Sequence, residues 1–388
     1  MSNIFKNVGG VMEYIQIFLL AAILIVGIVF IVKRFAGNKK EEGFSTILLT
    51  AGLELIVTSF GTIQDKILPI VTLLKVSVNA QEASNIIDSA SQVNVVQLIT
   101  GFVLLIAGAG LYYYTKNKIY VLNINGYFDK RIENHHKDLG LSAFEFKERE
   151  IDFIRTFNKG ISDEISNDII EEIKSKVEPF KNESKEFKRG YTGIAPIPFI
   201  MLAGTLMKKE KINEYYEYDK KETQKYYKLT KGRGIFRKKY QPLKLVTDIN
   251  SINIGVNEVV VAVTVTSDIT DADLAQFNGK EVVKLAIAVT CDNAIRYKEQ
   301  LREYTCSVYD TIEQLGKLVK GLRKIHLVYS GQSCLALEIG KVIDDNRMPQ
   351  IINYQYKNQA VNRYPWGIIM NGDCKGEYVE YIQSEENE

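Results

Sequence analysis

The sequence predicts a helical membrane region followed by an α/β part that is made of two similar halves. Long apolar runs fill the first part of the chain, and two later stretches repeat one pattern. Each repeat has a small-residue loop, an apolar helix and a Tyr-x-Tyr strand: Gly193–Gly204 with Tyr216-Glu217-Tyr218, then Gly331–Gly340 with Tyr354-Gln355-Tyr356. We therefore expect a membrane region over residues 1–116, a first half over 117–235 and a second half over 236–388.

Composition narrows the classes of function. The formal net charge of +2 over 388 residues gives no global basic field of the kind that long nucleic acid requires. The four cysteines, Cys291, Cys306, Cys334 and Cys374, lack metal-ligand spacing, which predicts reduced thiols and no metal site. No Walker loop, GxSxG or HExxH motif is present, so we expect no catalytic residue.

The membrane region contains three candidate spans, at about 15–33, 44–63 and 96–115. Ile15–Val32 has Gln16 as its one polar side chain and is about as long as a membrane-crossing helix. The third span carries Gly101, Gly108 and Gly110, and such small residues allow close contact between helices.

The basic flanks favour three crossings over two. Lys33 and Arg34 follow the first span, and Lys116 and Lys118 follow the last. Three crossings place both flanks on the cytoplasmic side, whereas two cannot. Two spans with an amphipathic middle segment remain the alternative, and both arrangements allow a cytoplasmic C-terminal domain.

Glu54 is the acidic residue inside the middle apolar segment. A carboxylate that faces lipid is costly, which favours a polar seam or a pore between subunits. The equally weighted alternative is a protonated side chain, or one satisfied by a neighbouring threonine or helix end.

Strands and helices alternate through the rest of the chain. The expected strands are Ile119–Ile124, Val259–Val265, Ile325–Tyr329 and Gln350–Tyr356, and the expected helices include Ile161–Val177 and Val308–Leu322. This alternation predicts parallel sheets with right-handed crossovers. Ligands of such folds bind at the carboxyl ends of the strands, beside helix N-termini.

That rule selects candidate ligand-binding residues in both halves. Small loop residues leave backbone N–H groups open to phosphate oxygens, and one tyrosine of each pair could stack on a base while the other enters the core. The alternative for each is an ordinary helix cap or core residue. The candidates are Asn125, Gly126, Thr192, Gly193, Ala195, Pro196, Tyr216 and Tyr218 in the first half, and Ser267, Asp268, Ser330, Gly331, Gln332, Ser333, Tyr354 and Tyr356 in the second.

The stretch Lys324–Leu327, the helix Cys334–Gly340 and the strand Ile351–Tyr356 resemble the SAVED domain. The resemblance implies a fusion of two CARF-like, Rossmann-type halves that senses cyclic oligonucleotides in bacterial anti-phage signalling. The usual proline of the second loop is absent here, and Pro196 and Pro198 lie in the first loop instead.

With membrane spans in front, the chain resembles a membrane-anchored SAVED effector of the CBASS type. That resemblance implies a multi-pass protein of the bacterial inner membrane that binds a cyclic di- or trinucleotide made by a CD-NTase. The nucleotide is a ligand, and no cofactor is implied. Binding would drive homo-oligomerisation, and the helices would then disrupt the lipid bilayer and kill the infected cell, an abortive infection.

Three alternatives remain. The first is a CRISPR-linked membrane effector that is activated by cyclic oligoadenylate. The second is a membrane-anchored enzyme that degrades the messenger, for which Ser267, Asp268 and Ser333 are candidate groups. The third is a structural membrane protein with an inactive Rossmann-like lobe.

Overall fold

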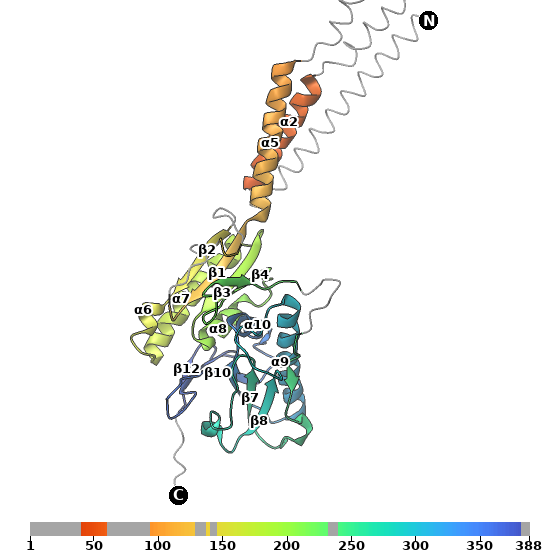
Figure 1. The fold of residues 1–388 in the computed structure, drawn as a ribbon. Coiled ribbons are helices and arrows are strands. Elements are labelled where there is room, and N and C mark those ends of the chain that lie inside the picture. The colour runs from red at the N-terminus through yellow and green to blue at the C-terminus, as the bar shows by residue number, and fades with distance from the viewer. Residues whose placement is uncertain (1–39, 60–93, 129–136, 140–145, 232–239, 382–388) are drawn as a thin grey trace, which may run out of the picture. The chain divides into compact units, whose positions relative to one another are not determined.

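The computed structural model describes residues 40–59, 94–128, 137–139, 146–231 and 240–381. The chain divides into two compact units, Met1–Lys118 and Ile119–Glu388 (Figure 1). The first expected span, the end of the second and the basic flank at Lys33 and Arg34 lie outside the described residues.

In the first unit, helices α2 (Lys40–Ser59) and α5 (Val95–Asn117) pack against each other through glycines. A Cβ atom added at Gly52 would lie 2.8 Å from the carbonyl oxygen of Gly101, and one at Gly108 would lie 2.8 Å from the backbone nitrogen of Leu49. Gly101 and Gly108 therefore make the expected close contact, whereas a Cβ at Gly110 would meet nothing within 4 Å.

One helix among the described residues, Val95–Tyr113, is long and apolar enough to cross a membrane. It coincides with the third expected span, and the apolar helix Gly43–Ser59 in the second expected span is shorter. A single such helix is weak evidence for a membrane region, so the three-span arrangement stays a prediction. Glu54 is half-buried on α2, and its backbone carbonyl accepts a hydrogen bond from Thr58 Oγ1 at 2.9 Å.

The first sheet of the second unit has the strand order β2-β1-β3-β4-β5. Its strands are β1 (Ile119–Asn125), β2 (Phe146–Asp152), β3 (Lys188–Ile194), β4 (Glu214–Tyr218) and β5 (Tyr226–Lys228). The short helix α6 (Ile154–Phe157) and α7 (Asp163–Glu183) connect β2 to β3, and α8 (Ile197–Met207) connects β3 to β4. All neighbours pair in parallel except β4 and β5.

The second sheet has the order β12-β11-β10-β9-β7-β8-β6. Its strands are β6 (Lys244–Leu245), β7 (Glu258–Thr264), β8 (Glu281–Ala286), β9 (Lys324–Ser330), β10 (Gln350–Gln355), β11 (Trp366–Ile369) and β12 (Tyr378–Glu380). The 3₁₀ turns η2 (Ile249–Ser251) and η3 (Ala275–Phe277) flank β7; α9 (Lys298–Leu318) precedes β9, and α10 (Ser333–Val342) follows it.

The two sheets repeat one plan. The order β2-β1-β3-β4-β5 recurs as β8-β7-β9-β10-β11, with parallel pairing throughout except at the last strand of each set. The helices recur as well, because α7 corresponds to α9 and α8 to α10. The expected parallel pairing holds for the central strands and is wrong at the edges, where β5, β6, β11 and β12 each pair antiparallel with the adjacent strand nearer the centre of the sheet. These strands are short and lack a strong period of their own.

Local sequence explains the main elements. Every residue of β1 is buried, Asn123 and Asn125 included, and burial along a whole strand is typical of a parallel strand that is covered on both faces. Helix α7 begins after Ser162, whose Oγ accepts a hydrogen bond from Ile165 N at 3.3 Å. Asp163 and Glu164 in its first turn are favourable at the positive end of the helix dipole.

Helices α8 and α10 join the two halves at their closest point. A Cβ atom at Gly204 would collide with the carbonyl oxygen of Leu337, and one at Gly340 would collide with that of Met201. Glycine at both positions therefore lets the two helix backbones touch.

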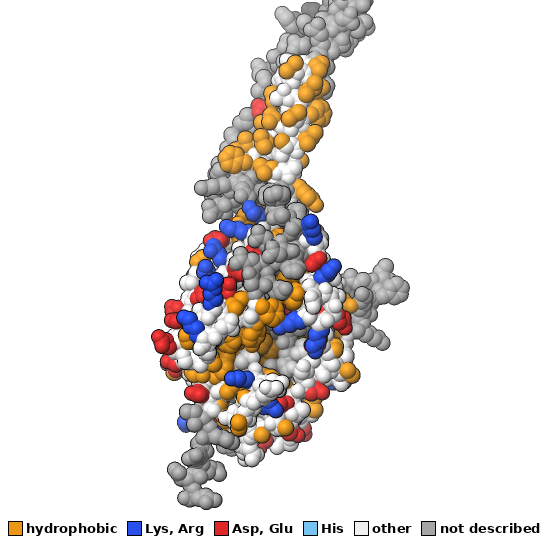
Figure 2. Space-filling model, turned by 60° about the vertical axis from the view of Figure 1, so that its left-hand side comes forward, with side chains coloured by type: hydrophobic (Ala, Val, Ile, Leu, Met, Phe, Trp, Pro, Cys, Tyr) orange, Lys and Arg blue, Asp and Glu red, His pale blue; other side chains and the backbone are white. Residues whose placement is uncertain are grey.

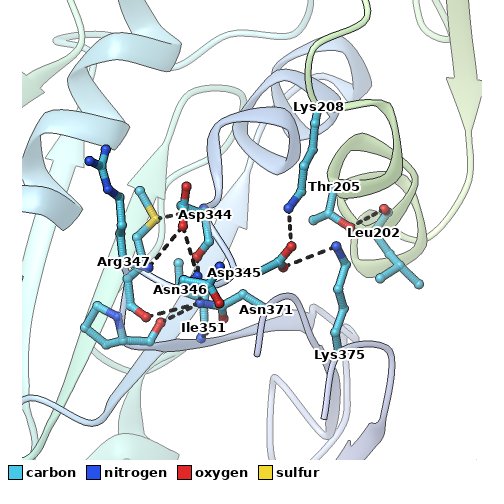
Figure 3. Close-up of polar contacts among 12 residues, drawn as sticks. Leu202, Thr205, Lys208, Asp344, Asp345, Asn346, Arg347, Ile351, Asn371 and Lys375 are labelled. Atoms are coloured by element: carbon cyan, nitrogen blue, oxygen red, sulfur yellow. Dashed lines mark hydrogen bonds and ion pairs between the residues drawn. The ribbon is translucent and has the colours of Figure 1, made fainter. Parts of the chain in front are cut away.

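Beyond the C-terminal ends of these helices, the ion pair between Lys208 and Asp345 links the two halves, within a group of polar contacts of the second half (Figure 3). Asp345 forms one ion pair with Lys208, the residue that follows α8, and another with Lys375 at 3.3 Å. The amide of Asn371 donates to the carbonyl oxygen of Pro349 at 2.9 Å and accepts from Ile351 N at 2.7 Å.

Candidate ligand-binding site

A cavity of about 610 Å³ lies in the second unit, where the carboxyl ends of strands from both sheets meet. Loops after β3, β7 and β9 and the ends of β4 and β10 supply most of its lining. This is the edge at which doubly wound folds bind ligands.

Most of the candidates taken from the sequence line this cavity. They are Gly193, Ala195, Tyr218, Ser267, Asp268, Ser330, Gly331, Gln332, Ser333 and Tyr356. The structure therefore brings the two repeated loops together with one tyrosine from each Tyr-x-Tyr strand.

The other candidates do not line the cavity, for reasons of local packing. Tyr216 and Tyr354 are buried in the core. Residues two apart on a strand face the same side, so alternation does not separate the tyrosines of a pair; Tyr218 and Tyr356 reach the cavity because they stand at the carboxyl ends of β4 and β10. Asn125 donates to Glu150 Oε1 at 2.9 Å, and Thr192 is fully buried. A Cβ atom at Gly126 would lie 2.8 Å from Pro196 Cδ, so these two residues pack on each other.

Each small loop depends on a buried tyrosine two residues before its glycine. A Cβ atom at Gly193 would collide with the hydroxyl of Tyr191, and one at Gly331 would collide with that of Tyr329. The Tyr329 hydroxyl donates to the carbonyl oxygen of Gln332 at 2.7 Å, which fixes the turn into α10. Glycine is required at both sites because the tyrosine occupies the space of a side chain.

The central residues of the two Tyr-x-Tyr strands cap helices of the opposite half. Glu217 on β4 accepts from Ser333 Oγ at 3.0 Å and from Cys334 N at 2.7 Å, at the start of α10. Gln355 on β10 accepts from Ile197 N at 2.9 Å, at the start of α8. Each half thus completes a helix terminus of the other, and both side chains line the cavity.

Gln332 lines the cavity, but its amide is used for structure. Its Oε1 accepts from Ile295 N at 2.5 Å, and its Nε2 donates to the Tyr227 hydroxyl at 2.7 Å. The expected donor is thereby tied to β5 and to the loop before α9. Ser330 is similar, because its Oγ accepts from Ser267 N at 2.9 Å.

The cavity carries more carboxylates than ammonium groups. Glu217, Asp219, Asp268, Asp273 and Asp292 line it together with Lys220 and Lys221. Lys221 pairs with Asp292 at 2.5 Å, and the Lys220 ammonium lies 5.1 Å from the ring of Phe128 and 5.9 Å from that of Tyr127. The face of the unit seen in Figure 2 likewise intersperses acidic and basic side chains.

Burial changes the proton affinity of several of these groups. It raises the pKa of Glu217, although hydrogen bonds from Cys334 and Ser333 oppose the shift. Desolvation lowers the pKa of Lys220, against the attraction of Glu217 and Asp292. A backbone hydrogen bond from Glu222, with further bonds from Thr223, lowers the pKa of Asp219 to about 2.

Several lining residues were missed by sequence reasoning, including Tyr127, Glu217, Asp219, Lys220, Lys221, Asp292 and Gln355. Glu217 and Gln355 had a usable signal, because each is the middle residue of a repeated Tyr-x-Tyr strand. Asp292 had none, since its loop is far away in sequence. Within the described residues, no group of three or more His, Cys, Asp or Glu side chains is placed to hold a metal ion.

Comparison with known proteins identifies a sensor family. The pattern of the SAVED family, described as "SMODS-associated and fused to various effectors sensor domain", matches residues 170–370. No curated protein matches the sequence.

Solved structures of receptors described as containing SAVED/CARF domains are similar at 12% sequence identity. The Acinetobacter baumannii Cap4 receptor with the cyclic trinucleotide 2'3'3'-cAAA has a TM-score of 0.43, over 80% of this chain and 63% of that one. The Moraxella osloensis Cap4 receptor has a TM-score of 0.40, over 79% and 61%. The chain thus spans less than two thirds of the length of these receptors. By the family match over more than half of its length, the chain belongs to the SAVED family.

Proposed function

We propose that this protein is a membrane-anchored receptor for a cyclic oligonucleotide and acts in bacterial defence against phage. The observation that carries the proposal is the cavity, which a chain of the SAVED family builds from matched loops of two repeated sheets. A cavity with two similar sides suits a ligand whose units repeat. Its volume of about 610 Å³ is within the usual range for small-molecule sites.

The ligand is a cyclic di- or trinucleotide made by a CD-NTase. Gly193 and Gly331 give it close access to backbone, and Tyr218 and Tyr356 offer ring faces on which bases stack. The cyclic trinucleotide in the A. baumannii receptor supports this class of ligand. The protein uses no cofactor in this scheme.

The response is physical rather than chemical. Ligand binding favours a homo-oligomer, the N-terminal helices gather in the bacterial inner membrane, and the membrane loses its integrity. A ligand that binds one assembly state more tightly shifts the population by that difference in affinity, so no catalytic group is needed. The apolar helix Val95–Tyr113 and its close pairing with α2 support a membrane role for this segment.

Titration of the full chain in detergent micelles with a panel of cyclic nucleotides tests the proposal. The panel contains 2'3'3'-cAAA, 3'3'3'-cAAA and several cyclic dinucleotides, with calorimetry for binding and sedimentation for assembly. We expect one member to bind and to shift the protein to larger species.

Tyr356→Ala serves as the loss-of-function variant, and Tyr309→Ala, on α9 and outside the cavity lining, is the matched control. Equal binding by both variants, or no binding of any panel member to folded protein, would contradict the proposal. Appearance of a linear product from the cyclic nucleotide would favour the enzyme alternative.

A further inference from the structure

The two sides of the cavity differ in charge at one matched position. Glu217 and Gln355 hold equivalent places in the two halves, and each accepts a hydrogen bond at the N-terminus of a helix from the other half. A neutral amide completes this contact at α8, so capping alone does not require a negative charge. A carboxylate that is only 7% exposed carries a desolvation cost that the amide avoids.

The Glu217 carboxylate occupies the place where α10 would otherwise hold an anion. Helix N-termini bind phosphates through their free N–H groups and the positive end of the helix dipole. At α10, the Ser333 hydroxyl and the Cys334 amide both donate to Glu217 Oε1, at 3.0 and 2.7 Å. A phosphate placed there would find both donors already used, and the negative charge of the Glu217 carboxylate would repel it.

Lys220 is the better place for a phosphate. It lines the same cavity, above the rings of Tyr127 and Phe128. Lys221 already pairs with Asp292, whereas no ion pair among the described residues involves Lys220. Its ammonium makes no hydrogen bond to another described residue, so its hydrogen-bond donors are available to a ligand.

We propose that Glu217 is a specificity-determining residue, which keeps phosphate off α10, directs it to Lys220 and turns hydrogen-bond donors of a base or ribose toward α10. This assignment rests on the proposed function, since it orients the nucleotide within the same cavity. It makes the two similar sides of the cavity unequal, so the ligand binds in one orientation.

The Cys334 amide reports directly on this position. The chain has four cysteines, so ¹⁵N-cysteine labelling of the full chain in micelles gives four backbone amide signals, and Cys334→Ala assigns one of them. Inorganic pyrophosphate is the probe, which separates this test from the identity of the messenger. We expect pyrophosphate to leave the Cys334 signal of the wild type unchanged and to shift it in Glu217→Gln. The dissociation constant of pyrophosphate should fall about tenfold in Glu217→Gln, because the negative charge of the carboxylate is removed.

Asp268→Asn is the matched control, because it removes one negative charge from the cavity lining without touching α10. It should leave the Cys334 signal insensitive to pyrophosphate. A pyrophosphate-induced shift in the wild type would overturn the proposal, and this arm does not depend on any variant folding. A Glu217→Gln protein that keeps the other three cysteine signals and shows no shift at Cys334 would overturn it as well.

Lys220→Gln tests the second part of the proposal. Calorimetry should show pyrophosphate binding about tenfold more weakly than to the wild type, because one ammonium group is lost. Binding that is unchanged in Lys220→Gln would overturn the assignment of Lys220. If the messenger panel fails while these results hold, the proposed function fails and the charge asymmetry of the cavity stands.

Discussion

Tyr191 and Tyr329 show how single side chains shape the cavity. Each fills the space above a glycine two residues later, Gly193 or Gly331, and so leaves the loop backbone bare toward the ligand space. The same residue pair recurs in both halves, which indicates that the loop geometry depends on it. A methyl group at either glycine must displace a buried ring.

Gly331→Ala should destabilise the second unit by about 1–3 kcal/mol, the usual effect of inserting a methyl group into a packed site. Thermal unfolding followed by the fluorescence of Trp366, the one tryptophan of the chain, measures this. Gly316→Ala in α9 is the control, because a Cβ atom there would come no closer than 3.8 Å to another atom. An equal effect of both substitutions would contradict the role of Tyr329.

Glu258 and His326 form a second polar cluster near the amino ends of β7 and β9, whereas the cavity loops follow the carboxyl ends of these strands. Glu258 contacts Lys280 at 2.6 Å and His326 Nε2 at 3.0 Å, and His326 Nδ1 lies 2.9 Å from the Tyr354 hydroxyl. Burial would raise the pKa of Glu258, but the hydrogen bonds from Lys280 and His326 lower it to about 2. Burial lowers the pKa of His326, and Glu258 opposes that shift.

The lowered pKa of Glu258 predicts acid sensitivity. Its stabilisation is present above the pKa of an unfolded glutamate, about 4.3, and is lost as the pH falls toward 2. Glu258→Gln should cost about 1–2 kcal/mol at pH 7, after allowance for solvent screening, and nothing near pH 2. Denaturant midpoints of the full chain at several pH values measure the difference. A difference that does not change with pH would contradict this account.

At the scale of elements, the contact of α8 with α10 fixes how the two halves meet. Gly204 and Gly340 allow the helix backbones to touch, and the caps at Glu217 and Gln355 hold the N-terminal ends of the same helices. The cavity lies beside those caps, so its shape depends on the crossing of the two helices.

Gly204→Ala should therefore weaken both stability and ligand binding. The methyl group meets the rigid carbonyl oxygen of Leu337, so the helices must separate, at an expected cost of about 2–3 kcal/mol. Trp366 fluorescence gives the unfolding temperature, and calorimetry with the bound panel member gives the affinity. Asp345→Asn, which removes only the half-buried ion pairs at the other end of the helices, should change either value little. A Gly204→Ala protein with wild-type affinity would show that the helix crossing does not set the cavity.

At the scale of the whole molecule, messenger binding should be coupled to membrane damage. Full-length protein in dye-filled vesicles of bacterial lipid should release dye when the bound panel member is added. Gly101→Leu should reduce this release, because a side chain there meets Ile56 and the carbonyl oxygen of Gly52. Gly110→Leu is the matched control on the same helix, where a Cβ atom meets nothing within 4 Å. Release without messenger, or equal release by both variants, would contradict the coupling.

The sequence by itself determined the order of the main elements and the duplication. Buried strands such as β1 and β7 are rich in apolar and β-branched residues, and the loops after β3 and β9 carry the small residues that precede a helix. Such signals are local, so they can be recognised in the sequence without knowledge of the fold. Most of the candidate residues that they selected line the cavity.

Only the tertiary structure decided what those residues do. It turned the Gln332 amide toward Ile295. It placed the side chains of Glu217 and Gln355 against the N-termini of helices in the opposite half. It also brought Asp292 to Lys221. These partners lie far apart in the chain, and no local period or propensity encodes a contact between distant segments. The charge balance of the cavity is a property of that packing, because buried and paired groups count differently from exposed ones.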